Sequence, residues 1–351
     1  MTRPALTEIA AEELAARVEA LGGRAFHARS ARAWVFRRGA RAWRTMTDLP
    51  KPLRERLAES VDVCALRVAG SARAPDGTVK LLLEARDGER IEAAAIPTGR
   101  RLTACVSTQV GCAFRCPFCA SGAGGLVRDL SAGEIAEQIL HASSASERAA
   151  TNVVLMGVGE PLANLAGTLG AVRLVRDELG LGARRVTVST IGLVEGIAAL
   201  GREAPGVRLA VSLHAPTDEL RRRLLPHAPR TPLAGIVEAA DRYARDSGRW
   251  FTVEYTLLGG ANDGEDEARA LARLLSKKWA KVNLIPLNPG GPGSFEPPAP
   301  AAVRAFARLL KASGLEAPVR RARGLGAGAA CGQLRRSRGG DKIKSSKGDR
   351  P

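Results

Sequence analysis

Three cysteines in one short stretch constrain this chain more than any other feature of its sequence. Cys112, Cys116 and Cys119 follow a Cys-x3-Cys-x2-Cys spacing, with Phe118 directly before the last of them. Thiolates on one short loop are the usual ligands of iron–sulfur clusters, and three of them leave one iron of a [4Fe–4S] cluster open. A structural zinc ion would need a fourth ligand at close spacing, for which Cys105 would have to be recruited. The spacing therefore favours an iron–sulfur cluster over zinc.

From about residue 101 the sequence alternates between apolar strand patterns and amphipathic helix patterns. Continuously apolar strands are expected when helices cover a parallel sheet. Six strand–helix units predict an α/β fold, a partial (β/α)6 barrel with its active site at the carboxyl ends of the strands. The predicted strands span residues 103–107, 152–156, 185–189, 208–213, 251–257 and 281–286. The predicted helices span residues 131–142, 165–178, 194–200, 218–224, 233–245 and 265–276.

The segments on either side of the barrel differ in composition and predict appended units. We expect helices over residues 4–21, 27–38 and 50–60, and short strands over residues 63–68, 79–83 and 91–96. The predicted division is a helical N-terminal domain (1–60), a small β extension that connects it to the barrel (61–100), the barrel core (101–334) and a basic, disordered tail (335–351).

Positive charge gathers near both ends of the chain. Lys and Arg number 53 against 36 Asp and Glu, a net charge of +17, and residues 24–56 hold ten basic residues against two acidic ones. A genome that prefers arginine could account for part of the excess, but the clustering favours a nucleic-acid partner. We expect phosphate contacts from five arginines of this region: Arg29, Arg32, Arg37, Arg38 and Arg41. Trp34 and Trp43 are expected beside them as packing or stacking residues, and a tryptophan placed like Trp34 is more often part of a core.

Cysteine usage and hydropathy predict a cytoplasmic protein. Four of the six cysteines lie between residues 105 and 119, which suits a cytosolic metal or redox site better than a disulfide framework. Apolar runs are too short to cross a bilayer, and the N-terminus lacks the apolar core of a signal peptide. No membrane partner is therefore expected.

Polar residues stand at the ends of several predicted strands. Gly157-Val158-Gly159-Glu160-Pro161 follows one strand, and its glycines would let the backbone approach a ligand while the carboxylate accepts hydrogen bonds from an ammonium group. A simple tight turn is the alternative. Ser189, Ser212-Leu213-His214 and Asn283 with Asn288 follow other strands and could equally cap helices. Their shared position at one edge of the predicted barrel favours ligand contacts.

Taken together, these motifs closely resemble the ribosomal RNA adenine-C2 methyltransferase family of radical S-adenosylmethionine enzymes. The resemblance runs from about Gly23 to Leu334. It rests on the cysteine spacing and on further sequence words: Met46–Lys51, Cys105–Cys112, Gly157–Pro161, Ser212–Pro216, Asn262-Asp263, Asn283–Pro286 and Ala329–Leu334.

The resemblance implies the chemistry. Such enzymes methylate C2 of an adenine in 23S ribosomal RNA, and in some transfer RNAs, with a [4Fe–4S] cluster and S-adenosylmethionine that is cleaved to a radical. Cys331 matches the cysteine that carries the methyl group, Cys105 the one that releases product through a disulfide, and Glu92 the proton acceptor. The implied S-adenosylmethionine contacts are Gly159, Glu160, Ser189, Ser212, Leu213, His214 and Asn288. A flavodoxin-like or ferredoxin-like system is the implied electron source.

A few positions depart from the family pattern, and two other functions stay open. Gly326-Ala327 replaces an Asp-Ile pair, Pro226–Pro229 replaces a stretch that usually holds Asn, and Asp129 stands where Asn is typical. These changes concern substrate choice and loop dynamics, and they fit a divergent paralogue. The alternatives are methylation of C8 of the same adenine by the same cysteines, and a non-catalytic iron–sulfur RNA-binding factor.

Overall fold

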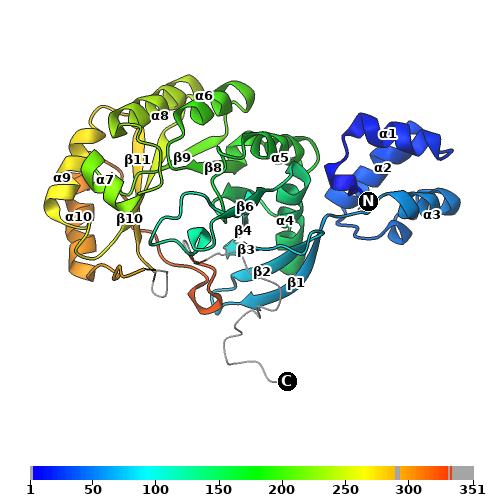
Figure 1. The fold of residues 1–351 in the computed structure, drawn as a ribbon, viewed down its shortest axis with the longest axis horizontal. Helices are drawn as coiled ribbons and strands as arrows, with labels where there is room; N and C mark the ends of the chain where they lie inside the picture. The colour runs from blue at the N-terminus through cyan, green and yellow to red at the C-terminus, as the bar shows by residue number, and fades with distance from the viewer. Residues whose placement is uncertain (1–2, 289–292, 331–332, 334–351) are drawn as a thin grey trace.

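A curved sheet covered by helices forms the body of the protein in its computed structural model, which describes residues 3–288, 293–330 and 333. Helices lie around the outside of the sheet, and a separate group of helices sits at one side (Figure 1). Cys331 and the predicted tail lie outside the described residues.

The described residues form one nine-stranded sheet in the order β1-β2-β3-β4-β7-β8-β9-β10-β11. From β4 onward every neighbouring pair in it is parallel, which confirms the predicted partial (β/α)6 barrel. Its parallel strands are β4 (Arg101–Cys105), β7 (Asn152–Leu155), β8 (Val186–Thr190), β9 (Arg208–Ser212), β10 (Phe251–Leu257) and β11 (Ala280–Pro286). The antiparallel strands β1 (Leu66–Arg73), β2 (Val79–Ala85) and β3 (Arg90–Thr98) extend the same sheet, because β3 pairs with β4.

Amphipathic helices bury their apolar faces against this sheet. The main core packs strand residues such as Val188, Val211 and Val253 against helix residues such as Ile197 and Ile236, all nearly inaccessible to solvent. The helices are α4 (Ala132–Ala145), α5 (Leu165–Asp177), α6 (Val194–Glu203), α7 (Asp218–Leu224), α8 (Leu233–Ser247), α9 (Glu265–Leu274) and α10 (Pro300–Ala312). The sequence reading missed α10, whose proline stands in the first turn and whose Phe306 packs on Tyr255 of β10.

The N-terminal helices enclose a second hydrophobic cluster centred on Leu14, Val35, Met46 and Leu57. They comprise η1 (Leu6–Glu8), α1 (Ala11–Ala20), α2 (Ala25–Phe36), η2 (Trp43–Thr45) and α3 (Lys51–Ser60). The prediction of one continuous helix over residues 4–21 is wrong. The backbone is extended at Ile9, and the Ile9 carbonyl accepts a hydrogen bond of 2.9 Å from Arg32 instead of continuing a helix.

Arg32 is therefore not available as an RNA contact, which corrects the prediction for this residue. Its side chain is buried and forms an ion pair of 2.8 Å with Glu178, just beyond α5 of the barrel.

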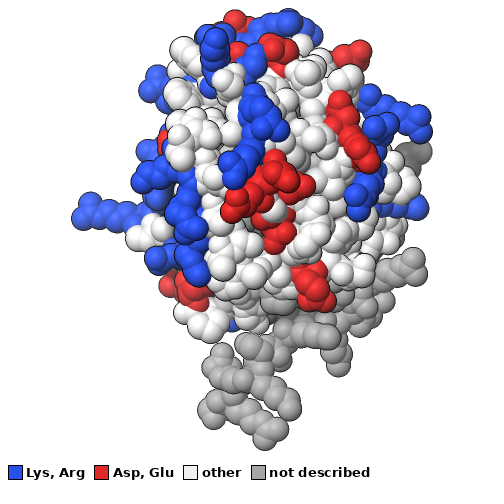
Figure 2. All heavy atoms as spheres, turned by 90° about the vertical axis from the view of Figure 1, so that its left-hand side faces the viewer, with Lys and Arg blue, Asp and Glu red and all other residues white. Residues whose placement is uncertain are grey.

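Arg29, Arg37 and Arg38 are exposed, and Arg38 lies over the half-buried ring of Trp34. On the opposite side of the molecule, Figure 2 shows basic and acidic side chains interspersed, without one continuous basic surface.

A buried carboxylate joins the N-terminal helices to the barrel. Glu137 of α4 accepts hydrogen bonds of 2.7 Å from the backbone N–H groups of Ala65 and Leu66, and another from the Thr7 hydroxyl. Burial raises the pKa of Glu137 to about 7 against these lowering contacts. The hydrogen bonds also explain why β1 begins at Leu66 rather than at residue 63 as predicted.

Among the described residues, no helix combines the length and the apolar character needed to cross a bilayer. The domain division made from the sequence stays a prediction.

We expect Glu137→Gln to destabilise the fold. The amide can accept at only one of its two terminal atoms, so a buried donor loses its partner, at a cost of about 1–3 kcal/mol. Thermal unfolding at neutral pH measures the effect, and Glu13→Gln, which removes an exposed pair within α1, is the matched control. Equal melting temperatures for the two variants would contradict the role given to Glu137.

Candidate active site

The three cysteines lie on a tight loop inside a short hairpin formed by β5 (Gln109–Gly111) and β6 (Leu126–Asp129). The loop is closed at its base by a hydrogen bond of 3.0 Å from the Cys112 N–H to the Gly125 carbonyl. Gly111 has a φ of 82°, and a Cβ there would lie 1.8 Å from the Gly125 oxygen, so only glycine fits. The sequence reading missed this hairpin, whose strands are too short to show a pattern.

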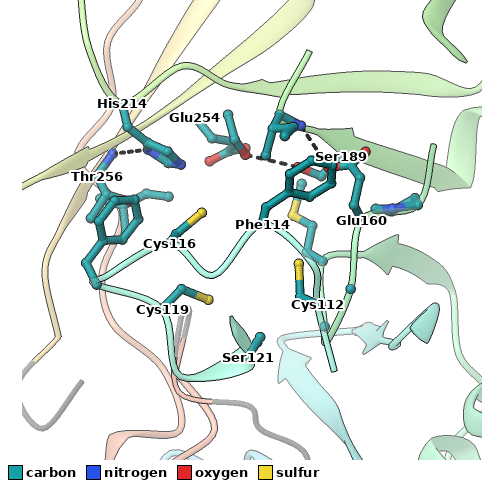
Figure 3. A pocket seen from close by; sticks show the side chains of 18 of the residues that line it. Cys112, Phe114, Cys116, Cys119, Ser121, Glu160, Ser189, His214, Glu254 and Thr256 are labelled. Atoms are coloured by element: carbon teal, nitrogen blue, oxygen red, sulfur yellow. Dashed lines mark hydrogen bonds between the residues drawn. The ribbon is translucent and has the colours of Figure 1, made fainter. Parts of the chain in front are cut away.

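The loop directs all three cysteines toward one cavity. Cys112, Cys116 and Cys119 line a hollow of about 1000 Å³ that is partly open to solvent, and Figure 3 shows their sulfur atoms turned toward its interior. No group of three or more His, Cys, Asp or Glu among the described residues is arranged to hold a single metal ion. Three thiols turned into one hollow fit a multi-iron cluster.

The electrostatic environment of the thiols fits the same interpretation. Burial, helped by the nearby Cys119 and Glu160 and opposed by backbone hydrogen bonds, raises the pKa of Cys112 to about 11. Burial also raises the pKa of Cys116 well above its usual range. Such thiols lose their protons when positive metal ions bind, so Cys112, Cys116 and Cys119 are the residues that would hold a [4Fe–4S] cluster.

The Gly-rich turn after β7 forms one wall of the cavity. Gly159 has a φ of 106°, and a Cβ there would clash with the Gln109 side chain at 2.6 Å. The Glu160 carboxylate is buried and accepts hydrogen bonds from the backbone N–H groups of Leu162 at 3.1 Å and Ile191 at 2.9 Å. Burial raises the pKa of Glu160 to about 7, although these contacts and Thr190 oppose the shift. Burial therefore makes this acid easier to protonate than an ordinary glutamate.

The ends of the next strands supply a second wall. Ser189 and Ser212 line the cavity with their hydroxyl oxygens 3.4 Å apart. His214 is buried, has a φ of 58°, and accepts a hydrogen bond of 3.0 Å at Nδ1 from the Thr256 N–H. Burial lowers the pKa of His214 to about 3, so its ring is neutral and its proton lies on Nε2.

The structure thus gathers most of the predicted cofactor positions around one cavity. Leu213 differs because its side chain is in the main core, and only its backbone faces the strand ends. The predicted residues that line the cavity are Cys112, Cys116, Cys119, Gly159, Glu160, Ser189, Ser212, His214 and Asn288. Their proposed roles stay predictions.

The sequence patterns did not reveal the charged residues Glu254 and Arg320, which line the cavity, or Arg221, which lies behind its wall. The Arg221 guanidinium is buried and donates to the carbonyl oxygens of Leu213 at 2.7 Å, Ser212 at 3.1 Å and Ile191. Glu254 lines the cavity from within β10 and accepts a hydrogen bond of 2.7 Å from Asn283. A carboxylate inside an apolar strand was a usable signal for Glu254, whereas nothing set Arg221 apart from the arginines that follow it.

Cys105 and Glu92 lie outside the wall of this cavity but next to it. Cys105 ends β4 and belongs to a buried cluster that also contains Ala327 and Ala329 of the segment that leads to Cys331, and Met156, which lines the cavity, packs against this cluster. Glu92 is buried on the neighbouring strand β3 and lies 3.1 Å from the ammonium group of Lys80. The structure therefore brings Cys105 and this C-terminal segment together, although they are more than two hundred residues apart.

Comparison with known proteins agrees with this geometry. Residues 106–275 match the radical SAM superfamily, and residues 5–63 match the ribosomal RNA large subunit methyltransferase N-terminal domain. A probable dual-specificity RNA methyltransferase RlmN of Gloeobacter violaceus is 44% identical over 96% of both chains. The one of Moorella thermoacetica is 46% identical over 92% of this chain and 94% of its own. A solved radical SAM methyltransferase from Sphaerobacter thermophilus is 42% identical and superposes with a TM-score of 0.91 over 94% of this chain and 99% of its own.

Removing one cluster ligand should abolish iron binding. We expect Cys112→Ala, Cys116→Ala and Cys119→Ala each to lose the bound iron and sulfide after anaerobic reconstitution, because two thiolates cannot hold the cluster. Chemical iron and sulfide assays with visible absorption measure the loss. Cys64→Ala, which changes a cysteine outside the loop, should keep its iron; iron retained by all three loop variants would contradict the assignment.

Proposed function

The chain belongs to the RlmN-type family of radical S-adenosylmethionine RNA methyltransferases, and on that basis we propose that it methylates C2 of an adenine through a methylated Cys331. The proposed substrates are 23S ribosomal RNA and transfer RNA, in the cytoplasm. A flavodoxin-like or ferredoxin-like protein is the proposed electron donor.

The observation that supports a cysteine-carried methyl group is the position of Cys105. It belongs to a buried cluster that contains Ala327 and Ala329 of the segment that leads to Cys331 and that contacts Met156 of the cavity wall. C2 of adenine is electron-poor, so direct transfer of a methyl cation to it is chemically mismatched. A binding protein without this activity would need neither cysteine, which argues against the alternative of a non-catalytic RNA-binding factor.

The residues of the site then have the following proposed roles. Cys112, Cys116 and Cys119 hold the [4Fe–4S] cluster, which with S-adenosylmethionine supplies the radical that activates the methyl group. Gly159, Glu160, Ser189, Ser212, His214 and Asn288, with the Leu213 backbone, position S-adenosylmethionine. Cys331 carries the carbon to the base, Glu92 accepts a proton, and Cys105 bonds to the Cys331 sulfur as the carbon–sulfur bond breaks.

The exposed arginines in α2 and directly after it are proposed to bind RNA. Arg29, Arg37 and Arg38 project into solvent, while Arg32 is excluded by its buried ion pair. Phosphate contacts of this kind position the substrate without reading its bases. Selection of the target base would then depend on the cavity and on the residues around Cys105.

Two cysteine variants test the proposed mechanism. We expect Cys331→Ala to leave RNA unmethylated, because no sulfur is available to carry the methyl group. Cys105→Ala should accumulate a covalent protein–RNA adduct, because the carbon–sulfur bond is no longer broken by disulfide formation. Anaerobic turnover on ribosomal RNA fragments, followed by gel shift and nucleoside mass spectrometry, measures both, with Cys64→Ala as the control.

The same experiment separates the alternatives. A methyl group on C8 rather than C2 would identify the C8 methyltransferase, and an unmethylated RNA with wild-type protein would favour the RNA-binding factor. Methylation that survives in Cys331→Ala would contradict the cysteine carrier.

S-adenosylmethionine binding should depend on the ionisation of Glu160. Since the pKa of Glu160 is raised to about 7, its carboxylate is largely protonated below that pH and attracts an ammonium group less strongly. We expect affinity to increase as the pH rises through about 7, and Glu160→Gln to bind weakly with little pH dependence. Calorimetric titration of the reconstituted protein measures this, with the exposed Glu238→Gln as control; equal pH dependence in Glu160→Gln would contradict the contact.

A further inference from the structure

Two opposite charges are buried together in the antiparallel part of the sheet. The Lys80 ammonium of β2 lies 3.1 Å from the Glu92 carboxylate of β3. Lys80 is only 8% exposed and Glu92 only 1%, whereas neighbouring residues of both strands are mainly alanine and leucine. Taking two such charges out of water is costly, and a buried ion pair is often no more stabilising than two apolar side chains of similar size. Stability alone therefore gives a weak reason for this pair.

The register of the sheet places the pair beside Cys105. Lys80 pairs with Ala94 of β3, and Ala94 pairs with Cys105 of β4, so the three residues form one row across the sheet. Glu92 stands two residues before Ala94 and therefore faces the same side. Ser107, two residues after Cys105, also contacts β3 here, because its hydroxyl donates a hydrogen bond of 2.7 Å to the backbone carbonyl of Glu92.

The segment leading to Cys331 covers this face of the sheet. Ala327 and Ala329 share one buried cluster with Ala94 and Cys105, and Asp76 holds the start of the segment by accepting a hydrogen bond of 2.9 Å from the Gly324 N–H. A Cβ on Gly328 would lie 3.4 Å from the Lys80 nitrogen, so the segment passes directly over the ion pair.

From these contacts we infer that Lys80 is a positioning residue for the methyl transfer: its ammonium group orients the Glu92 carboxylate beneath the carrier segment. The inference rests on the proposed function. In that reaction C2 of the base, once bonded to the carbon carried by Cys331, loses its proton to a Glu92 oxygen, and the bonding electron pair stays with the base. Lys80 forms no covalent bond; its ion pair with Glu92 sets the direction in which the carboxylate oxygens point.

The test combines single and paired substitutions in the reconstituted full-length protein. We expect Lys80→Met to lower kcat for C2 methylation by about 10- to 100-fold with little change in KM for RNA, because it disturbs the proton acceptor and not RNA binding. Lys80→Arg, which keeps the charge, should recover most of the rate. Lys80→Met in the Glu92→Gln background should have little further effect, because both changes remove the same function.

Two controls keep the outcome interpretable. Peptide mass spectrometry should find Cys331 methylated in Lys80→Met, since loading of the carrier does not use Glu92. Lys278→Met removes another partly buried lysine ion pair, with Glu238, and should react like wild type. If Lys80→Met does not fold, Lys80→Gln replaces it with the same expected result.

The outcomes distinguish this inference from the proposed function. A wild-type protein that does not methylate C2 contradicts the proposed function and this inference with it. A wild-type protein that methylates C2, with Lys80→Met equally fast or with its effect multiplying that of Glu92→Gln, contradicts the inference alone.

Discussion

The site depends on a pair of buried charges that tie together the ends of three parallel strands. The Ile191 N–H donates to the Glu160 carboxylate, and its carbonyl accepts from Arg221, which also binds the carbonyls of Ser212 and Leu213. Strand ends lack sheet partners for these groups, and buried polar groups without partners are costly. Glu160 and Arg221 thus satisfy the backbone of the cavity wall and hold β7, β8 and β9 in a constant relation to the cysteine loop.

Continuity of the sheet connects this cavity to the second half of the site. Because β3 pairs with β4, the small β extension belongs to the same sheet as the barrel. Cys105 stands where the two parts meet, with the cavity on one side and the Lys80–Glu92 pair on the other. The C-terminal segment crosses this boundary and is held at its start by Asp76. One continuous sheet therefore supports both the cavity and this segment.

Local patterns predicted the elements better than their contacts. All six parallel strands and their alternation with helices were expected, because continuous apolar runs of this length suit a covered parallel sheet. The helix over residues 4–21 was wrong because a tertiary contact, Arg32 to the Ile9 carbonyl, replaces a helical hydrogen bond. Arg32 itself could not be told from the exposed arginines beside it, since its partner Glu178 is distant in sequence.

By itself, the sequence determined the cysteine loop, the order of the six parallel strands and the helices between them, and the residues at the strand ends. These follow from spacing within a few residues and from the period of each element, which are local properties of the chain. Only the tertiary structure decided that Glu254 lines the cavity, that Arg221 binds the backbone of its wall, that Leu213 points into the core, and that Lys80 lies beside Glu92. Such contacts arise from strand register and helix packing between distant segments, and no local pattern encodes them. The three cluster cysteines illustrate the first case, because one short loop brings them together. Cys105 and the C-terminal segment illustrate the second, because only the folded sheet brings them together.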